Sequence, residues 1–502
     1  MSTLKKNVIA NYAGKAWAAL INIAFVPLYI KHMGIEAYGL VGIFATIQPL
    51  MTILDLGLSP SINRELARYS AASGQEQVMR NLVRTLEVVY WGLAAVLCCV
   101  VLLVSPMVAA NWVKPQALPL EVVKQSVLLM GLSIVFQWPV GFYTGGLMGL
   151  QRQVLFNSIN TVLWTLRGVG ALVVVMLASS PVLAFFWWQL LMSITNVAAV
   201  AIALWRSLPV GGQRSRFQGE LVQSVWRLAI GMSAVSVVIL LFNQLDKIVL
   251  SKQLSLIEFG YYSLAWQVVG SLFMLYYPIY AAFFPVITQL RAKGDHAELK
   301  LTYHKGCQLM AVAVFPISAV LAVYSREILS LWIADQETVQ YSYLILSVLL
   351  VGGTLNGLLY MPYSLQQAFG ETRYILYVFM PFLLVYAPLL VLAVKVWGVL
   401  GAAVTFSLIS LLQNAIAVFV THKRFIPGEQ AKWFWEDLCR PLAAAVAVVV
   451  LIKFAVFWRM SGLAGVATIA LCYLLSFVAT VLVTPATNSI FRRYVLPAIS
   501  VR

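Results

Sequence analysis

The sequence predicts an all-α protein that crosses a membrane many times. Of its 502 residues, 61% are hydrophobic and 10% are charged, whereas about a quarter of the residues in ordinary soluble domains are charged. A soluble protein of this length needs a charged surface, and this chain has too few charged residues to form one. The hydrophobic residues also gather in runs of about 18 or more, long enough to cross a hydrocarbon core of about 30 Å.

Hydropathy and charge together predict about 14 transmembrane helices. No connection between them exceeds about twenty residues, which excludes an appended globular domain. The predicted spans cover roughly residues 8–30, 38–60, 86–110, 123–148, 155–178, 182–205, 228–250, 259–287, 304–324, 341–367, 374–394, 398–420, 441–458 and 462–483.

The net charge of +16 follows from a membrane topology and does not require a nucleic-acid partner. When the connections are numbered alternately from a cytoplasmic N-terminus, most of the 34 Lys and Arg residues fall on the cytoplasmic side. This is the positive-inside pattern of membrane proteins. We therefore predict a multi-pass protein with both termini in the cytoplasm.

Two polar connections mark the predicted domain boundaries. Residues 207–227 form a basic, Gly-rich linker, and residues 422–440 place Trp433, Phe434 and Trp435 among charges, a pattern typical of the membrane interface. The predicted parts are an N-lobe of six spans (1–206), a C-lobe of six spans (228–421), and a C-terminal helix pair with a cytoplasmic tail (441–502).

A short internal sequence repeat, whose two copies we term the echo turns, supports this division. Ile35-Glu36-Ala-Tyr-Gly-Leu precedes the second span, and Ile257-Glu258-Phe-Gly-Tyr-Tyr precedes the eighth. Two such short matches are weak evidence, because apolar sequence supplies them by chance. They favour two six-helix lobes related by a pseudo-two-fold axis, a design in which transporters hold the substrate between their repeats.

Polar side chains inside several spans share narrow helical faces at 100° per residue. Ionised groups that face lipid cost a few kcal/mol each, so these faces are expected to meet protein or water. The residues concerned are Lys15 and Asn22 (first span), Asp55 (second), Arg167 (fifth), Asn243 and Lys247 with Asp246 at the edge of their face (seventh), and Asn356, Tyr360, Tyr363 and Gln367 (tenth).

These polar helical faces, or stripes, have two interpretations. For a single Asn, Ser or Thr we favour interhelical hydrogen bonds that hold the bundle together. For Lys15, Arg167 and Lys247 an intramembrane charge favours a functional role, and three cationic stripes predict one polar cavity that attracts an anion. The aromatic and amide groups of the tenth span suit stacking on sugar rings. Asp246 can still pair locally with Lys247, and Asp55 can cap a helix end.

We predict no metal and no cofactor. The five cysteines lack metal-ligand spacing and lie in or beside hydrophobic runs, so they are interpreted as small core residues. Nothing resembles a nucleotide-binding loop, so ATP is not the expected energy source.

Four segments carry a resemblance to a known family. They are Asp55-Leu-Gly-Leu-Ser-Pro-Ser-Ile-Asn-Arg64-Glu-Leu-Ala, Gly149-Leu-Gln-Arg152, Gln244-Leu-Asp246-Lys247-Ile-Val-Leu-Ser-Lys running into Gly260-Tyr-Tyr-Ser-Leu-Ala, and Ile328-Leu-Ser-Leu-Trp332-Ile. Spread in order over the first twelve spans, this set resembles the polysaccharide transporter family, the Wzx-type lipid-linked oligosaccharide flippases. That family belongs to the multidrug/oligosaccharidyl-lipid/polysaccharide exporter superfamily.

The resemblance implies a flippase in the bacterial inner (cytoplasmic) membrane. Its expected substrate is an undecaprenyl-diphosphate-linked oligosaccharide repeat unit, moved from the cytoplasmic to the periplasmic leaflet for O-antigen, exopolysaccharide or capsule synthesis. Cationic residues of the lumen are expected to hold the diphosphate and sugar acids, and the matching positions are Lys15, Arg64, Arg167 and Lys247. The implied partners are the lipid-linked substrate, membrane lipid and polysaccharide-assembly proteins such as a polymerase or a chain-length regulator. Ion coupling by H⁺ or Na⁺ through Asp55 or Asp246 is a separate hypothesis, because buried carboxylates can take up a proton or sodium.

Many members have twelve helices, so fourteen predicted spans are a departure from the family pattern. The departure suggests a comparison with peptidoglycan-precursor flippases, in which an extra helix pair makes a groove for the lipid tail. Spans 13 and 14 are expected to act likewise.

Two other functions remain open. A small-molecule or multidrug exporter of the same superfamily would share the fold, but a cationic lumen disfavours cationic cargo by repulsion. A membrane-embedded glycan polymerase or ligase is less favoured, because the outer loops are short and no site meets the usual requirements for catalysis. We therefore predict that the protein is not an enzyme.

Overall fold

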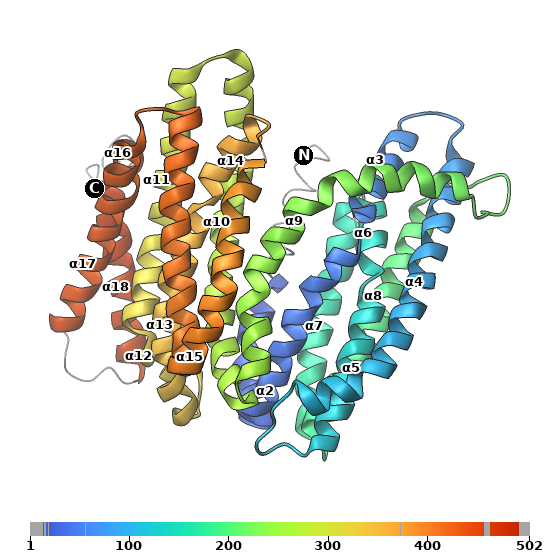
Figure 1. Cartoon of the computed structure of the whole chain (residues 1–502), viewed down its shortest axis with the longest axis horizontal. Helices are drawn as coiled ribbons and strands as arrows, with labels where there is room; N and C mark the ends of the chain where they lie inside the picture. The colour runs from blue at the N-terminus through green and yellow to red at the C-terminus, as the bar shows by residue number, and fades with distance from the viewer. Residues whose placement is uncertain are drawn as a thin grey trace, which may run out of the picture. The chain divides into compact units, whose positions relative to one another are not determined.

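The structure is a computed structural model of the chain. It describes residues 14, 17–18, 20–55, 57–371, 373–455 and 462–490, with side chains except those of 222–236, 373–375, 378, 463 and 489–490. Every regular element within these residues is helical, which confirms the predicted all-α class (Figure 1).

Eleven helical segments of the described chain are long and apolar enough to cross a membrane. Two of them, Val26–Asp55 and Phe379–Phe425, each contain parts of two predicted spans. The helix changes direction inside them at Gly34 (φ 82°) and Gly398 (φ 58°). Only glycine adopts such positive φ values readily, so these two residues separate neighbouring spans without a loop. The predicted seventh span is not among the eleven and lies in the helix Gly219–Gln253, part of whose side chains is outside the described residues.

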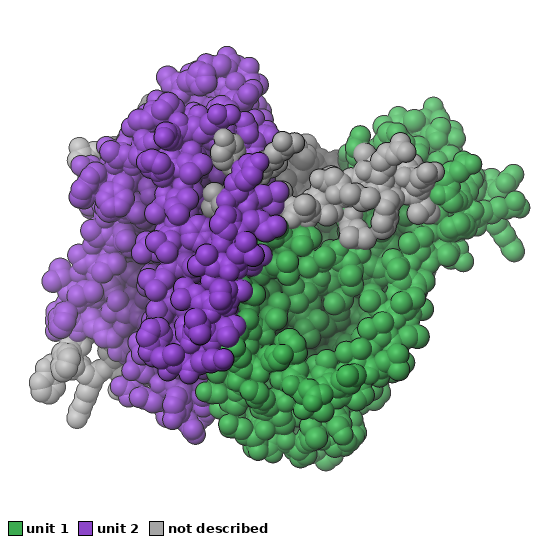
Figure 2. All heavy atoms as spheres, viewed as in Figure 1, with its two compact units in different colours: residues 1–260 green, residues 261–502 purple. Residues whose placement is uncertain are grey.

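The chain divides into two compact units, Met1–Gly260 (unit 1) and Tyr261–Arg502 (unit 2), coloured separately in Figure 2. The helices of unit 1 are α2 (Val26–Leu50), η1 (Met51–Asp55), α3 (Leu58–Ser70), α4 (Glu76–Asn111), α5 (Leu120–Gln137), α6 (Val140–Gly149), α7 (Gln153–Leu177), α8 (Pro181–Ser207) and α9 (Gly219–Gln253).

The division after Gly260 differs from the predicted linker at 207–227, because α9 packs on α2, α3 and α4. The linker itself is bonded to α4. Backbone N–H groups of Gln213, Arg216 and Gln218 donate to side-chain oxygens four residues apart on one face of α4 (Gln77, Asn81 and Thr85) at 2.9–3.0 Å. Compact units and sequence repeats are different divisions, so the six-plus-six lobes stay a prediction.

The predicted second span, 38–60, is broken into three elements. Pro49 lies in the last turn of α2, the chain continues as the short 3₁₀ helix η1, and Gly57 (φ 81°) then starts α3. Proline removes a backbone hydrogen bond and glycine adopts positive φ, so both changes of direction are encoded locally. The break places Asp55 at the junction of η1 and α3.

Helices α3 and α6 approach closely at two glycines. A Cβ atom on Gly145 would lie 2.4 Å from the carbonyl oxygen of Ser59, and one on Gly149 would lie 2.5 Å from that of Asn63. Glycines four residues apart let two helix backbones touch. Beside them, Tyr90, Phe142 and Tyr143 fill the core of unit 1.

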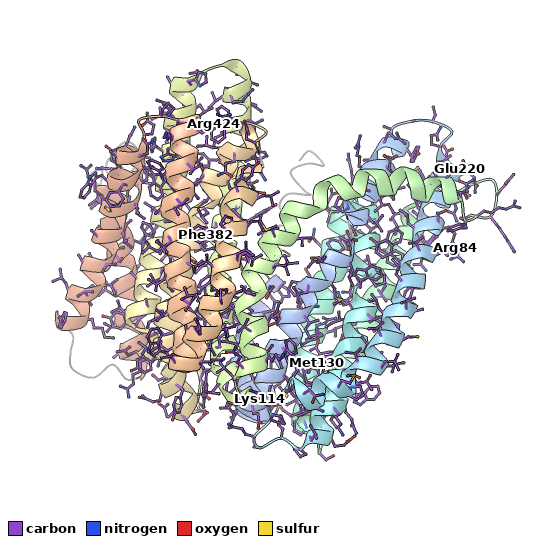
Figure 3. The ribbon with its side chains drawn as sticks, in the orientation of Figure 1. Arg84, Lys114, Met130, Glu220, Phe382 and Arg424 are labelled. Carbon is purple, nitrogen blue, oxygen red and sulfur yellow. The ribbon has the colours of Figure 1, made fainter. Side chains whose placement is uncertain are left out.

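The two echo turns meet within unit 1. A Cβ atom on Gly39 would lie 2.3 Å from the carbonyl oxygen of Leu256, and one on Gly260 would lie 2.4 Å from that of Ile35. The neighbouring loop joins the same contact, because Lys114, labelled in Figure 3, donates from Nζ to the carbonyl oxygen of Gln253 at 2.9 Å. The repeated Gly-containing turns therefore pack reciprocally.

Unit 2 carries the remaining helices, and the first of them begins at the end of unit 1. They are α10 (Leu256–Lys293), α11 (His296–Val323), α12 (Ser325–Trp332), α13 (Gln336–Leu358), α14 (Tyr360–Ala368), α15 (Arg373–Phe425), α16 (Gln430–Lys432), the π-helix η2 (Trp433–Cys439), α17 (Arg440–Ala455), α18 (Gly462–Val483) and α19 (Pro485–Ile490).

The predicted C-terminal helix pair is α17 and α18, which pack on each other and on α11. Their shared core includes Phe315, Val449 and Cys472. In the connection before them, Phe434 and Trp435 are exposed, as the interface pattern predicts, but Trp433 is buried against the protein. This segment is thus partly a packing element of unit 2.

Candidate functional site

A cavity of about 330 Å³ lies in unit 1, between the α2–η1–α3 segment and the junction of α5 and α6. Apolar side chains such as Ile134 and Val140 form part of its wall. Its polar lining comes from Gln48, Thr52, Asp55, Ser59, Gln137 and Trp138. A mostly apolar cavity with a few convergent polar groups is the usual form of a ligand site.

Asp55 is held in the wall of this cavity by hydrogen bonds. Its Oδ1 accepts a hydrogen bond from the hydroxyl of Ser59 at 2.6 Å and another from the hydroxyl of Tyr90. Its Oδ2 accepts one from the Ser59 N–H at 3.1 Å. Asp55 thus forms the helix-end contact that the sequence left open, and it also lines the cavity.

Arg167 lies behind the same cavity wall. From α7 its Nη2 donates to Gln137 Oε1 at 3.1 Å and to Ser193 Oγ at 3.3 Å, and its guanidinium lies 5.6 Å from the ring centre of Trp164. All of these partners within the described chain are neutral. Arg167 is partly buried. Partial loss of water around a charge whose partners are neutral is unfavourable, so an anionic group that reaches Arg167 gains favourable energy.

Lys247 is placed differently from the prediction of a free lumen cation. Its Nζ donates to Asp246 Oδ1 at 3.1 Å and to the backbone carbonyl of Asn243 at 2.8 Å. Lys247 is 6% exposed and Asp246 is 1% exposed. The local pair that the sequence left open is therefore formed, and it neutralises both charges inside unit 1.

Two other unit 1 candidates, Asn22 and Arg64, are not among the residues that line the cavity. Lys15 lies outside the described residues, and Asn22 and Arg64 are exposed. Beside Arg64 on α3, Arg68 pairs with Glu65 at 2.5 Å. The structure thus brings Asp55 and Arg167 to one cavity and leaves Asn22 and Arg64 apart from it.

The polar face predicted for the tenth span contacts a second helix of unit 2, α10. Tyr280 on α10 donates its hydroxyl hydrogen to Gln367 Oε1. The Tyr280 ring centre lies 5.6 Å from that of Tyr360 and 6.1 Å from that of Tyr363. Tyr280, Tyr360, Tyr363 and Gln367 form what we term the tyrosine cluster, and Asn356 lies one turn before it at the end of α13.

Several of these residues were missed at the sequence level. Gln137, Trp138 and Tyr90 are not among the site residues predicted from the sequence. A signal did exist for α10, because Tyr276 and Tyr280 are four residues apart and share one helical face. Tyr276 packs 6.1 Å from Tyr360 and donates its hydroxyl hydrogen to the Thr354 carbonyl at 3.1 Å.

Comparisons with known proteins agree with this architecture. The family model described as "Polysaccharide biosynthesis protein" matches residues 4–291, more than half of the chain, and the MatE model matches residues 232–392. A "Putative O-antigen transporter" from Shigella flexneri is 22% identical over 411 residues, which cover 80% of this chain and 94% of the relative. "Uncharacterized membrane protein EpsK" from Bacillus subtilis (strain 168) is 22% identical over 495 residues, or 93% of each protein.

Solved structures show the fold. The lipid II flippase MurJ in an inward closed conformation has a TM-score of 0.70 at 15% identity, covering 97% of this chain and 98% of that one. An inward-facing MATE family multidrug transporter has a TM-score of 0.67 at 14% identity, covering 81% and 94%. The chain therefore belongs to the polysaccharide biosynthesis protein family, a polysaccharide transporter family of the multidrug/oligosaccharidyl-lipid/polysaccharide exporter superfamily.

Proposed function

We propose that this protein is a flippase for undecaprenyl-diphosphate-linked oligosaccharide repeat units in the bacterial inner membrane. It moves them from the cytoplasmic to the periplasmic leaflet for O-antigen, exopolysaccharide or capsule synthesis. Family membership supports a polysaccharide precursor as cargo, and the O-antigen transporter relative supports a cell-surface glycan. The observation that carries the proposal is the position of Arg167 beside the unit 1 cavity, where it is partly buried and its described partners are all neutral.

Arg167 and its neighbours supply donors for an anionic or hydroxyl-rich cargo. Gln137 turns its amide oxygen to Arg167, which leaves its NH₂ group to donate toward the cavity. Trp138 also lines the cavity, and no partner for its indole N–H is described. A cation with two neutral donors recognises a sugar acid or a phosphate oxygen together with adjacent hydroxyls.

Asp55 gives the cavity a group through which an ion can drive transport. When Asp55 is ionised, its charge opposes an anion in the cavity, and a bound proton or Na⁺ removes that opposition. Cargo binding and ion binding are then linked through the charge of one site. Asp246 is the weaker candidate for this role, because it is committed to the buried pair with Lys247.

The tyrosine cluster of unit 2 is proposed to hold sugar rings. Tyr280, Tyr360 and Tyr363 present aromatic faces and hydroxyl groups, and Gln367 and Asn356 add amides nearby. Tyr277, on the same helix as Tyr280, is 45% exposed and extends the aromatic surface. Aromatic faces with hydroxyl and amide groups suit a glycan, which has apolar ring faces and polar edges.

Transport is proposed to proceed by alternating access of the two lobes while the polyprenyl tail stays in lipid. Arg64 and Arg68 draw the diphosphate to the cytoplasmic entrance, and Lys15 and Asn22 are proposed to line the path. Both termini are proposed to be cytoplasmic. A polymerase and a chain-length regulator are the proposed partners that receive the flipped unit.

Flipping in proteoliposomes tests this proposal. A lipid-diphosphate oligosaccharide is reconstituted with the protein, and its accessibility to an added membrane-impermeant sugar-modifying enzyme is followed. We expect protein-dependent transfer that falls about tenfold in Arg167→Gln, equivalent to ~1.4 kcal/mol of lost interaction. The control is Arg214→Gln, because Arg214 is exposed on the linker. Equal transfer by wild type and Arg167→Gln would contradict the role of the cavity.

The second candidate is a small-molecule exporter of the same superfamily, favoured by the MatE match and the similarity to a MATE structure. The same vesicles distinguish the two functions. Efflux of a small cationic dye without transfer of any lipid-linked glycan would support the exporter and overturn the flippase.

A further inference from the structure

A buried polar cluster lies along the first half of α11 in unit 2, outside the unit 1 cavity and the tyrosine cluster. Its centre is His304, which is 2% exposed, and it contacts Asp437 of η2, which is 3% exposed. The remaining members are Lys300 and Gln308 of α11 and Glu429 in the connection before α16.

Both ring nitrogens of His304 face carboxylate oxygens. Nδ1 lies 2.5 Å from Asp437 Oδ2, and Nε2 lies 3.2 Å from Glu429 Oε2. A carboxylate only accepts hydrogen bonds, and a neutral imidazole has a single N–H to donate. While both carboxyl groups are ionised, both contacts are hydrogen bonds only when His304 carries a proton on each nitrogen, as an imidazolium.

His422, the other buried histidine of this region, has a different environment. Its Nε2 lies 2.8 Å from the hydroxyl of Tyr303, and no partner is described for its Nδ1. A neutral ring satisfies this arrangement when its proton is on Nε2, because Nε2–H then donates to the Tyr303 hydroxyl oxygen and Nδ1 carries only a lone pair. A second N–H on His422 would be buried without an acceptor. The geometry therefore places the charge on His304.

The charges of the cluster balance when His304 is protonated. Lys300 Nζ lies 3.0 Å from Glu429 Oε1, so two cations face two carboxylates. Loss of the His304 proton leaves one negative charge in excess and one ring lone pair against a carboxylate oxygen. The other titratable groups around His304 are Tyr303 and Cys307 of α11, His422 of α15 and Glu436 of η2.

The cluster holds both ends of the α17–α18 hairpin. Asp437 lies in the π-helix that leads into α17, and Gln308 Nε2 donates to its Oδ1 at 2.8 Å. Gln308 Oε1 in turn accepts from the backbone N–H of Ala486, which follows α18, at 2.8 Å. One end of α11 thus fixes the entry and the exit of the hairpin. A π-helix is rare and often occurs at functional sites.

We propose that His304 is a proton-dependent latch for the α17–α18 hairpin. As an imidazolium it holds η2 and Glu429 against α11, and loss of its proton loosens η2 and, through Asp437 and Gln308, the start of α19. This role goes beyond the proposed transport function and does not depend on it.

Hydrogen exchange followed by mass spectrometry tests the latch on the full-length protein in detergent micelles. Amide protection of Trp433–Cys439 and Pro485–Ile490 is measured from about pH 5 to about pH 9, a range that brackets the ordinary titration range of histidine. Rates are corrected for the intrinsic pH dependence of exchange. In the wild type we expect protection of both segments to fall at least tenfold over this range, with α13 unchanged.

The decisive variant is His304→Gln, which removes the titrating group. We expect its protection in both segments to be independent of pH. The matched control is His296→Gln, because His296 is on the same helix but exposed, and its profile is expected to follow the wild type. A wild-type profile that is flat would overturn the latch, even if His304→Gln does not fold. A pH-dependent fall that persists in His304→Gln would overturn it as well.

Discussion

Gly39 and Leu256 are joined by a close backbone contact, because a Cβ atom on Gly39 would lie 2.3 Å from the Leu256 carbonyl oxygen. Gly260 approaches the Ile35 carbonyl in the same way, so the two echo turns of the sequence contact each other reciprocally. No residue with a side chain fits at either glycine unless the backbone moves. This pair of contacts explains why the echo contains glycine in both copies.

Alanine at either glycine is therefore expected to destabilise the protein. Gly39→Ala and Gly260→Ala should each cost about 1–3 kcal/mol, the usual effect of overpacking a close contact. Thermal unfolding in detergent measures the change. The control is Gly92→Ala on α4, where a Cβ atom meets nothing within 4 Å. Gly92→Ala should be neutral or slightly stabilising, because alanine favours helix. Unchanged stability of both test variants would show that the turns can separate at no cost.

The buried pair of Lys247 and Asp246 predicts a characteristic pattern of stabilities. Lys247→Met should destabilise the protein by about 3–5 kcal/mol, because it leaves Asp246 charged and buried without its partner. The double variant Lys247→Met/Asp246→Asn should recover much of that loss. Unfolding midpoints of the three proteins provide the measurement. If the single variant is as stable as the wild type, the pair does not neutralise the two charges, and Lys247 returns as a candidate lumen cation.

The position of Asp55 in the wall of the unit 1 cavity leads to a prediction about how transport responds to an ion gradient. Asp55→Asn keeps the shape of the side chain but cannot lose or gain a charge, so transport should no longer respond to an imposed proton or sodium gradient. Flipping in proteoliposomes with and without the gradient measures this response. The control is Asp335→Asn, since Asp335 only caps α13 in unit 2. A gradient response that survives Asp55→Asn assigns the coupling to another group.

The tyrosine cluster predicts a loss of apparent affinity for the glycan. Tyr360→Ala removes an aromatic face that contacts Tyr280 and Tyr276, and we expect the KM for the lipid-linked oligosaccharide to rise about tenfold, or ~1.4 kcal/mol. Initial flipping rates over a range of substrate concentrations give the KM. Tyr377→Ala is the control, because Tyr377 is 70% exposed on α15. An equal rise in the control would point to a general effect of losing tyrosine.

The carboxylate of Glu429 is expected to make the stability of the folded protein depend on pH in the acid range. Burial alone would raise the pKa of Glu429, but the neighbouring Lys300 and His304 outweigh it, and the net pKa lies below the usual value. A carboxylate with a lowered pKa stabilises the folded state above its unfolded pKa and loses that effect as the pH falls through its folded pKa. The wild type should therefore be more stable than Glu429→Gln near neutral pH, and the two should converge in acid. A stability difference that is constant with pH would contradict this prediction.

Much of the fold was predictable from local sequence. Long apolar runs specify membrane helices whatever they pack against, since a chain in lipid must satisfy its backbone hydrogen bonds internally. Gly34 and Gly398 mark where helices change direction, and Pro49 and Gly57 mark the break that positions Asp55. Even the pair of Lys247 with Asp246 was open to inference, because the two residues are adjacent.

The sequence by itself thus determined the helical class, the approximate spans and the helical faces on which polar residues gather. Only the tertiary structure decided which of those residues meet. Arg167 and Gln137 lie 30 positions apart, and His304 and Asp437 lie 133 apart. Periodicity places a residue on a face of its own helix, but the neighbour of that face depends on how helices distant in sequence pack. The cavity around Asp55 and the contacts of His304 with two carboxyl groups are properties of that packing.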